Sequence, residues 1–302
     1  MSIYCREVHE RVEKRIKKTR ERCKKKKCKW WCGCCNKWFC WLETYFLTVV
    51  SFPIRVVCEV VDGVLSFVGI FTSIIARIPL LGRLIRQLWG LLTEIVWRLV
   101  GILGTIADVI GWEWTKRLRI NIQILSNDKG PVASELDLAP YITDAQATYK
   151  EFHIKLIVED VDILSPAAPA YALKPGCDEG AFGDDYWLAG SWFETQANRY
   201  KSGYQGGGRR LIGYGGPVTV FVVEDVQGKA GCSLGPLSDY VTIEGTISGR
   251  SPKCLAHELG HACGYIHHAE NVNNLMSSRC GGTRLTKWQR IVIRSSRHVT
   301  YF

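Results

Sequence analysis

The chain has 302 residues, of which 47% are apolar and 23% are charged. This composition excludes a wholly disordered or collagen-like protein and leaves room for one or two folded domains. The formal net charge of +10 is confined to residues 1–41, and the rest of the chain is neutral overall. The excess charge therefore forms a basic arm and not a basic domain.

Residues 1–29 are a charged run that ends in the four lysines Lys24–Lys27. The run predicts a solvated helix or a disordered arm, which attracts anionic lipid or nucleic acid through long-range electrostatics. A nucleic-acid site would need aromatic side chains clustered beside basic ones, and the basic runs further along the chain lack them. We therefore expect anionic lipid as the partner of the arm and no nucleic acid.

Residues 30–114 are rich in cysteine and tryptophan and mostly apolar. Their longest charge-free run, Gly63–Ala76, is shorter than the roughly 20 residues of a membrane-spanning helix. Between residues 80 and 110, the polar side chains fall on one narrow stripe of a helix. They are Arg83, Arg86, Gln87, Glu94, Arg98, Thr105 and Asp108. The pattern predicts amphipathic helices, arranged as a hairpin.

A wide apolar face beside basic residues and acylatable cysteines is typical of helices that lie in a membrane interface. We predict that residues 30–114 form an all-α, membrane-associated region, and we favour the cytoplasmic side for the rest of the protein. Two alternatives remain open at this point. The helices could instead pack against the rest of the chain, or they could form a self-associating bundle.

Residues 115–302 have the pattern of a mixed domain. Period-two alternation over Leu118–Leu125 predicts a half-buried strand, Thr143–Lys150 a helix and Phe152–Asp160 the next strand. The segment 165–216 is rich in glycine, proline and aspartate and predicts a long loop. Val218–Val223 and Tyr240–Glu244 predict two short strands, and the expected fold class is α+β.

The segment 257–267 has the pattern H-E-x-x-H-x-x-G-x-x-H. On a helix, residues four apart lie on one face, so His257 and His261 present two imidazoles to one point. Glu258 is placed to hydrogen-bond a metal-bound water. Gly264 can leave the helix with a positive φ and bring His267 back as the third ligand. Three nitrogen ligands leave one position of tetrahedral zinc open, which is typical of a catalytic site.

Three neighbouring types of side chain are further candidates for the third ligand. No aspartate or glutamate follows Glu270, so a later carboxylate cannot supply the third ligand unless Glu270 itself serves. His268 is expected outside the coordination sphere, because adjacent side chains point in different directions. Cys263 is expected to be a small buried side chain and not a ligand.

The extended motif is followed nine residues later by Met276, and together they resemble the metzincin clan of zinc endopeptidases, with a spacing similar to its matrixin-like members. The resemblance covers about residues 115–302. It implies a metzincin-like catalytic domain with a mixed twisted sheet, an active-site helix and a C-terminal helix near Leu285–Ser296. It also implies that Met276 lies in a tight turn under one catalytic zinc ion. Asp239–Glu244 would be the sheet edge that pairs with an extended substrate.

The resulting hypothesis is a zinc-dependent endopeptidase that cleaves peptides or proteins with a zinc-activated water and Glu258 as general base. The alternative is a membrane-active or scaffold protein whose zinc-binding domain is regulatory or inactive. The predicted organisation is a basic arm (1–29), a helical membrane-associated region (30–114) and a metalloprotease domain (115–302).

Overall fold

The computed structural model describes residues 81–176, 184–199, 213–227, 231–233, 238–245 and 251–301, together with a few isolated positions. The predictions for the basic arm and for the cysteine-rich segment before residue 81 lie outside these residues. They stay predictions.

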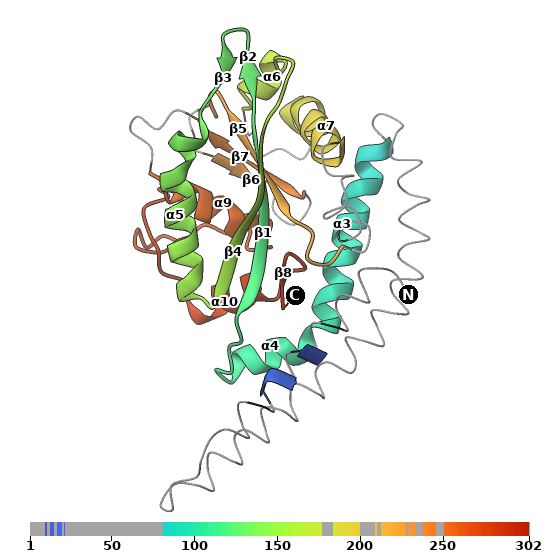
Figure 1. The fold of residues 1–302 in the computed structure, drawn as a ribbon, viewed down its shortest axis with the longest axis vertical. Helices are drawn as coiled ribbons and strands as arrows, with labels where there is room; N and C mark the ends of the chain where they lie inside the picture. The colour runs from blue at the N-terminus through green and yellow to red at the C-terminus, as the bar shows by residue number, and fades with distance from the viewer. Residues whose placement is uncertain are drawn as a thin grey trace, which may run out of the picture.

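A mixed, mostly parallel sheet of six strands forms the centre of the molecule (Figure 1). Its order is β4 (Ile154–Ile163), β1 (Lys116–Ile124), β5 (Val218–Val223), β7 (Tyr240–Glu244) and β6 (Gly231–Ser233). The first four of these are parallel, β6 is antiparallel to β7, and β8 (Val299–Thr300) is antiparallel to β1. A separate small hairpin consists of β2 (Ser126–Asn127) and β3 (Gly130–Pro131). The sheet and its helices confirm a mixed α/β architecture.

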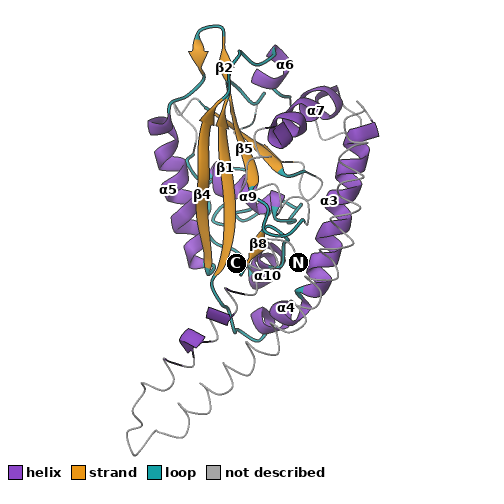
Figure 2. Cartoon of the chain, turned by 45° about the vertical axis from the view of Figure 1, so that its right-hand side comes forward, coloured by secondary structure: helices purple, strands orange, loops and turns teal. Residues whose placement is uncertain are grey.

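Helices cover both faces of the sheet (Figures 1 and 2). Successive side chains of a strand point to opposite faces. Val220 and Val222 of β5 belong to the core cluster that contains side chains of α5 (Glu135–Glu151) and α9 (Cys254–Ala262). Phe221 and Val223 belong to the cluster that contains side chains of α6 (Ala170–Leu173) and α7 (Asp184–Arg199). The sheet is therefore buried between two sets of helices.

Local sequence explains where two of the helices begin. Ser134 and Asp137 form a capping box at the start of α5, and Thr286 and Gln289 form another at the start of α10 (Lys287–Arg294). In each box, the side chain of the first residue accepts a hydrogen bond from the backbone N–H three positions later. The side chain at that later position accepts one from the backbone N–H of the first residue. The predicted helices Thr143–Lys150 and Leu285–Ser296 thus correspond to a longer α5 and a shorter α10.

The prediction of a loop throughout 165–216 is wrong, because α7 lies within that segment. The segment is rich in glycine, aspartate and aromatic residues, which favours a loop, but it also contains a weak helical periodicity of apolar residues. Ala189, Phe193 and Ala197 recur every four residues, and all three are buried beside Phe221 of the sheet. Packing of this stripe stabilises a helix that local propensity alone does not favour.

The predicted amphipathic helix is present as α3 (Leu81–Val100) and α4 (Ile102–Val109), with the break at Gly101. The part of its polar stripe that the structure describes, between Gln87 and Asp108, faces the rest of the protein. Arg98 forms an ion pair with Glu94 and donates to Ser295 Oγ at 2.6 Å. The backbone N–H of Arg297 donates to Glu94 at 3.1 Å. The tight approach of Gly213 to Thr93 adds a packing contact to this polar interface.

Asp108 of α4 forms the most buried ion pair of this interface. Its carboxylate lies 2.7 Å from Arg294 of α10 and 3.3 Å from the ammonium of Lys116. These three side chains are at most 5% exposed. Polar contacts therefore fix α3 and α4 against the domain predicted for residues 115–302. Among the described helices, none is both long enough and apolar enough to cross a membrane.

Candidate metal centre

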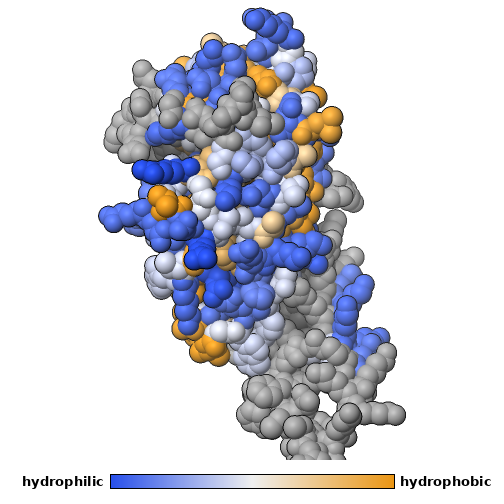
Figure 3. Space-filling model, turned by 90° about the vertical axis from the view of Figure 1, so that its left-hand side faces the viewer, coloured by the Kyte–Doolittle hydropathy of each residue, from blue (hydrophilic) through white to orange (hydrophobic). Residues whose placement is uncertain are grey.

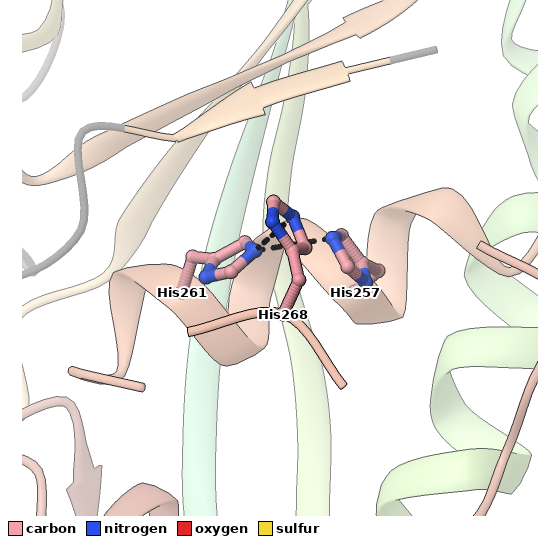
Figure 4. Close-up of side chains that lie close together, drawn as sticks. All are labelled: His257, His261 and His268. Carbon is pink, nitrogen blue, oxygen red and sulfur yellow. Dashed lines mark hydrogen bonds between the residues drawn. The ribbon is translucent and has the colours of Figure 1, made fainter. Parts of the chain in front are cut away.

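Three histidines meet beside helix α9 (Figure 4). His257 and His261 lie one turn apart on this helix, and their Nε2 atoms are 3.1 Å apart. His268 follows the helix, and its Nε2 lies 3.3 Å from that of His261. One ring nitrogen of each histidine lies within 4.8 Å of those of the other two. The arrangement is compatible with a single metal ion held by three imidazoles.

Backbone carbonyls orient two of these rings. Nδ1 of His257 lies 2.7 Å from the carbonyl oxygen of Leu275, and Nδ1 of His261 lies 2.6 Å from that of Tyr265. A carbonyl oxygen only accepts, so Nδ1 carries the proton and Nε2 presents its lone pair to the cluster. The carbonyls thus select the tautomer that can bind a metal.

Burial keeps these imidazoles neutral. It lowers the pKa of His257 below its ordinary value and, together with the neighbouring His257, lowers the pKa of His261 to about 4. Neutral imidazole is the form that binds metals. Both ligands from α9 are therefore ready to bind at neutral pH without losing a proton.

Gly264 turns the chain after the helix. It has φ of +94°, and its N–H donates to the carbonyl oxygen of His261 at 2.8 Å. A side chain at this position would also overlap the guanidinium of Arg98. The left-handed conformation and the close approach of α3 both favour glycine here. The sharp turn expected from the sequence is present.

The turn brings His268, and not His267, to the other two histidines. His267 and His268 are both exposed, but the ring of His267 lies edge-on to that of Tyr265, with the centroids 6.3 Å apart. The ring of His268 stacks on that of His257 at 5.3 Å. The segment after Gly264 is irregular, so spacing alone does not decide which of two adjacent histidines faces the cluster. The presence of two adjacent histidines, His267 and His268, is the sequence feature that leaves the third ligand ambiguous.

Glu258 is buried beside His257, with 5% of its surface exposed. It lies against β6, where a Cβ on Gly231 would be 3.0 Å from its Oε1. Burial raises the pKa of its carboxyl group well above the ordinary value, and the nearby Cys280 adds to the effect. A carboxylate oxygen of Glu258 lies within 4.8 Å of a ring nitrogen of His257.

Cys280 is a neighbour that the sequence analysis missed. Its sulfur, a carboxylate oxygen of Glu258 and a ring nitrogen of His257 all lie within 4.8 Å of one another. Cys280 is 7% exposed and has φ of +48°. It lies four residues after Met276, in a segment without regular secondary structure that no periodic pattern could place.

Met276 packs directly on the helix that carries the histidines. A Cβ on Gly260 would be only 2.6 Å from its sulfur, so the glycine permits a close approach. The backbone N–H of Met276 donates to the side chain of Asn274, which in turn donates to Gln289 of α10. The preceding residue, Leu275, supplies the carbonyl that orients His257. The methionine turn therefore positions the first histidine.

The predicted edge strand is in the interior of the sheet. Strand β7, Tyr240–Glu244, pairs with β5 on one side and with β6 on the other. The strand next to Glu258 at the end of the sheet order is β6, which has only three residues. Such a short strand shows no readable alternation, which is why the sequence did not reveal it.

Comparisons with known proteins give only distant likenesses. No protein-family model matches the sequence, and no curated protein is significantly similar to it. Metalloproteinase-II from Bacteroides fragilis is similar at a TM-score of 0.38 and 15% identity, over 58% of this chain and 49% of that one. A chaperone-substrate complex has a TM-score of 0.34 and 13% identity, over 55% and 28%. The chain thus spans less than half of either protein, and the site itself has to support any function.

Proposed function

We propose that the protein is a zinc-dependent endopeptidase with a metzincin-like catalytic domain. The observation that supports this function is the convergence of three imidazoles beside a buried glutamate. His257, His261 and His268 would hold the ion. His268 replaces His267 as the third ligand in this proposal, and Glu258 keeps the role of general base.

The donor set fits zinc. Three neutral imidazoles form a borderline-soft site that suits this ion, and they leave one position of a tetrahedron open. A bound zinc ion supplies Lewis-acid polarisation of a carbonyl and lowers the pKa of water. Hydrogen bonds from two of the ligands to backbone carbonyls hold the rings in place, so little reorganisation is needed on binding.

The carboxylate of Glu258 would accept the proton of the attacking water and pass it to the departing amine. Its position supports this role, because a carboxylate oxygen of Glu258 lies within 4.8 Å of a ring nitrogen of His257. The extended substrate would pair with the edge of β6, which lies directly against Glu258. The bond to be cleaved would then lie next to both the carboxylate and the histidines.

Glu258→Gln in the full chain tests this function. The variant should keep the zinc content of the wild type, because Glu258 is not a ligand, and should lose about 10²–10⁴-fold in cleavage of an unfolded protein substrate. Elemental analysis and a peptide-release assay measure the two quantities. Glu151→Gln, an exposed residue at the end of α5 that is not part of the histidine cluster, is the control and should cleave normally.

Two results would contradict the proposal. One is undiminished cleavage by Glu258→Gln. The other is a zinc-loaded wild type that cleaves no unfolded substrate. The second result would favour the alternative function, a membrane-active or scaffold protein with an inactive zinc-binding domain.

A further inference from the structure

Helices α3 and α4 present a continuous apolar face away from the sheet. Nine side chains from Leu88 to Ile110, the residue that caps α4, are between 39% and 66% exposed, and all nine are leucine, isoleucine or valine. They are Leu88, Leu91, Leu92, Ile95, Leu99, Ile102, Ile106, Val109 and Ile110. Their spacing of three and four residues gives one stripe along the two helices.

The orientation of this face is fixed by the opposite side of the same helices. Between residues 87 and 110 the charged side chains are Glu94, Arg98 and Asp108, and all three are directed toward the domain. Glu94 accepts from Arg297, and Asp108 forms an ion pair with Arg294. Rotating α3 to hide its leucines would break these buried contacts, which is costly.

The arrangement is the reverse of a helix on a water-facing surface, where the charged side points outward. Monomeric soluble proteins rarely expose a contiguous apolar patch larger than a few hundred Å². The side of the molecule that carries α5, far from α3, shows the usual pattern of mostly polar side chains with isolated apolar ones (Figure 3). The apolar face of α3 and α4 therefore requires an apolar partner.

We propose that this partner is the interface of an anionic lipid bilayer, in which the apolar face of α3 and α4 is embedded. Two features favour lipid over a protein. Among the described side chains between residues 87 and 110, none of the exposed ones is an aromatic residue or an arginine, the types that are enriched in protein interfaces. The chain also has its net charge of +10 within residues 1–41, and such a basic segment attracts anionic headgroups.

The mode of attachment follows from the length and the polarity of the helices. The described helices do not qualify as membrane spans, and α3 has one side committed to polar contacts with protein. A helix of this kind lies in the plane of the interface with one face in the acyl region. Apolar burial and electrostatic attraction together supply the two signals that stable attachment requires.

The embedded helix also contacts the end of α9, the helix that carries His257 and His261. Arg98, on the inner side of α3, donates to the carbonyl oxygen of Cys263, which is the last residue before the Gly264 turn. The lipid-facing helix and the catalytic helix are thus in direct contact. The docking proposal itself is independent of the proposed peptidase activity, and its test does not use that activity.

Vesicle flotation with the full chain tests the proposal. Wild-type protein should float with vesicles of phosphatidylcholine and phosphatidylserine. The triple variant Leu91→Gln, Leu92→Gln, Ile95→Gln should bind about tenfold or more weakly, because three side chains leave the acyl region. The control carries Leu136→Gln and Trp288→Gln, which are 85% and 68% exposed on other elements. It should float like the wild type. Circular dichroism verifies that every variant is folded.

Four results would overturn the proposal. The triple variant could float as well as the wild type, or binding could depend on salt alone, which would assign attachment to the basic arm only. The wild type could dimerise without binding vesicles, with the triple variant monomeric, which would identify a second copy as the partner. A monomeric wild type that does not float would show that another segment of the chain covers the face.

Discussion

Replacing Asp108 by asparagine removes the negative charge that two buried cations share. Arg294 Nη2 lies 2.7 Å from one carboxylate oxygen, and the ammonium of Lys116 lies 3.3 Å from the other. Their side chains are 0% and 5% exposed. In the Asp108→Asn variant both cations stay buried while the compensating charge is lost.

The expected loss is large because solvent cannot replace the carboxylate. Breaking a buried ion pair by removing one partner lowers the free energy of unfolding by about 3–5 kcal/mol. With the urea dependence usual for a domain of this size, the midpoint should fall by about 1 M or more. Arg294 keeps its bonds to the carbonyls of Phe152 and Trp114, so we expect the lower part of the range.

Urea unfolding followed by circular dichroism measures this effect, and Glu113→Gln is the matched control. Glu113 lies 2.8 Å from Arg290, whose side chain is 30% exposed. Removal of a partly exposed pair should cost about 1 kcal/mol or less. A second experiment compares the free energy of unfolding of fragment 81–302 with that of fragment 115–302. The fragment lacks Asp108 and Glu94 and should be much less stable.

The reasoning would be refuted if Asp108→Asn unfolded within about 0.5 kcal/mol of the wild type, the usual effect of a surface substitution. In that case α4 would not be part of the cooperative unit. The same conclusion would follow if fragment 115–302 were as stable as the longer chain.

Three further predictions concern the site and its surroundings. His268→Ala should abolish stoichiometric zinc binding in elemental analysis, whereas His267→Ala should retain it; the opposite result would restore His267 as the ligand. Gly264→Ala should lower both stability and zinc affinity, because it combines a strained φ with overlap on α3. Gly111→Ala, with φ of +84° and no atom near its Cβ, should show only the strain of about 1–2 kcal/mol and normal zinc binding. Burial lowers the pKa of Lys116 from 10.5 to about 8, so the unfolded state binds more protons between these values. The free energy of unfolding of the wild type should rise relative to Lys116→Met between pH 8 and pH 10, and urea titrations showing no such difference would contradict the burial argument.

The parts of the site that were predictable from sequence are those set by local geometry. Helical spacing places His257 and His261 together, and the need for a positive φ explains Gly264. The third histidine depends on the path of an irregular segment, so the sequence offered two candidates. Cys280 is close to Glu258 only because of tertiary folding, and no local pattern contains that information.

The same distinction applies to the fold. Strands β5 and β7 were predicted with their observed bounds, because alternation and β-branched residues mark them. The position of β7 in the sheet was not predictable, since it depends on pairing with the short β6. The amphipathic pattern identified α3 and α4, but a pattern of two faces does not say which one contacts protein. The contacts of Asp108 with Arg294 and of Glu94 with Arg297 identify the polar face as the one that contacts the domain.

The polar contacts of α3 and α4 also have a consequence for biosynthesis. Asp108 and Arg294 are 186 residues apart in sequence, and Glu94 and Arg297 are 203 apart. The ribosome synthesises the two helices before the domain. Asp108 and Glu94 can therefore form these contacts only after almost the whole domain has been synthesised. Contacts between such distant segments form late, and intermediates that expose apolar surface tend to aggregate. A nascent chain should therefore depend on a chaperone or a nearby membrane to shield its leucines until synthesis reaches α10 and β8.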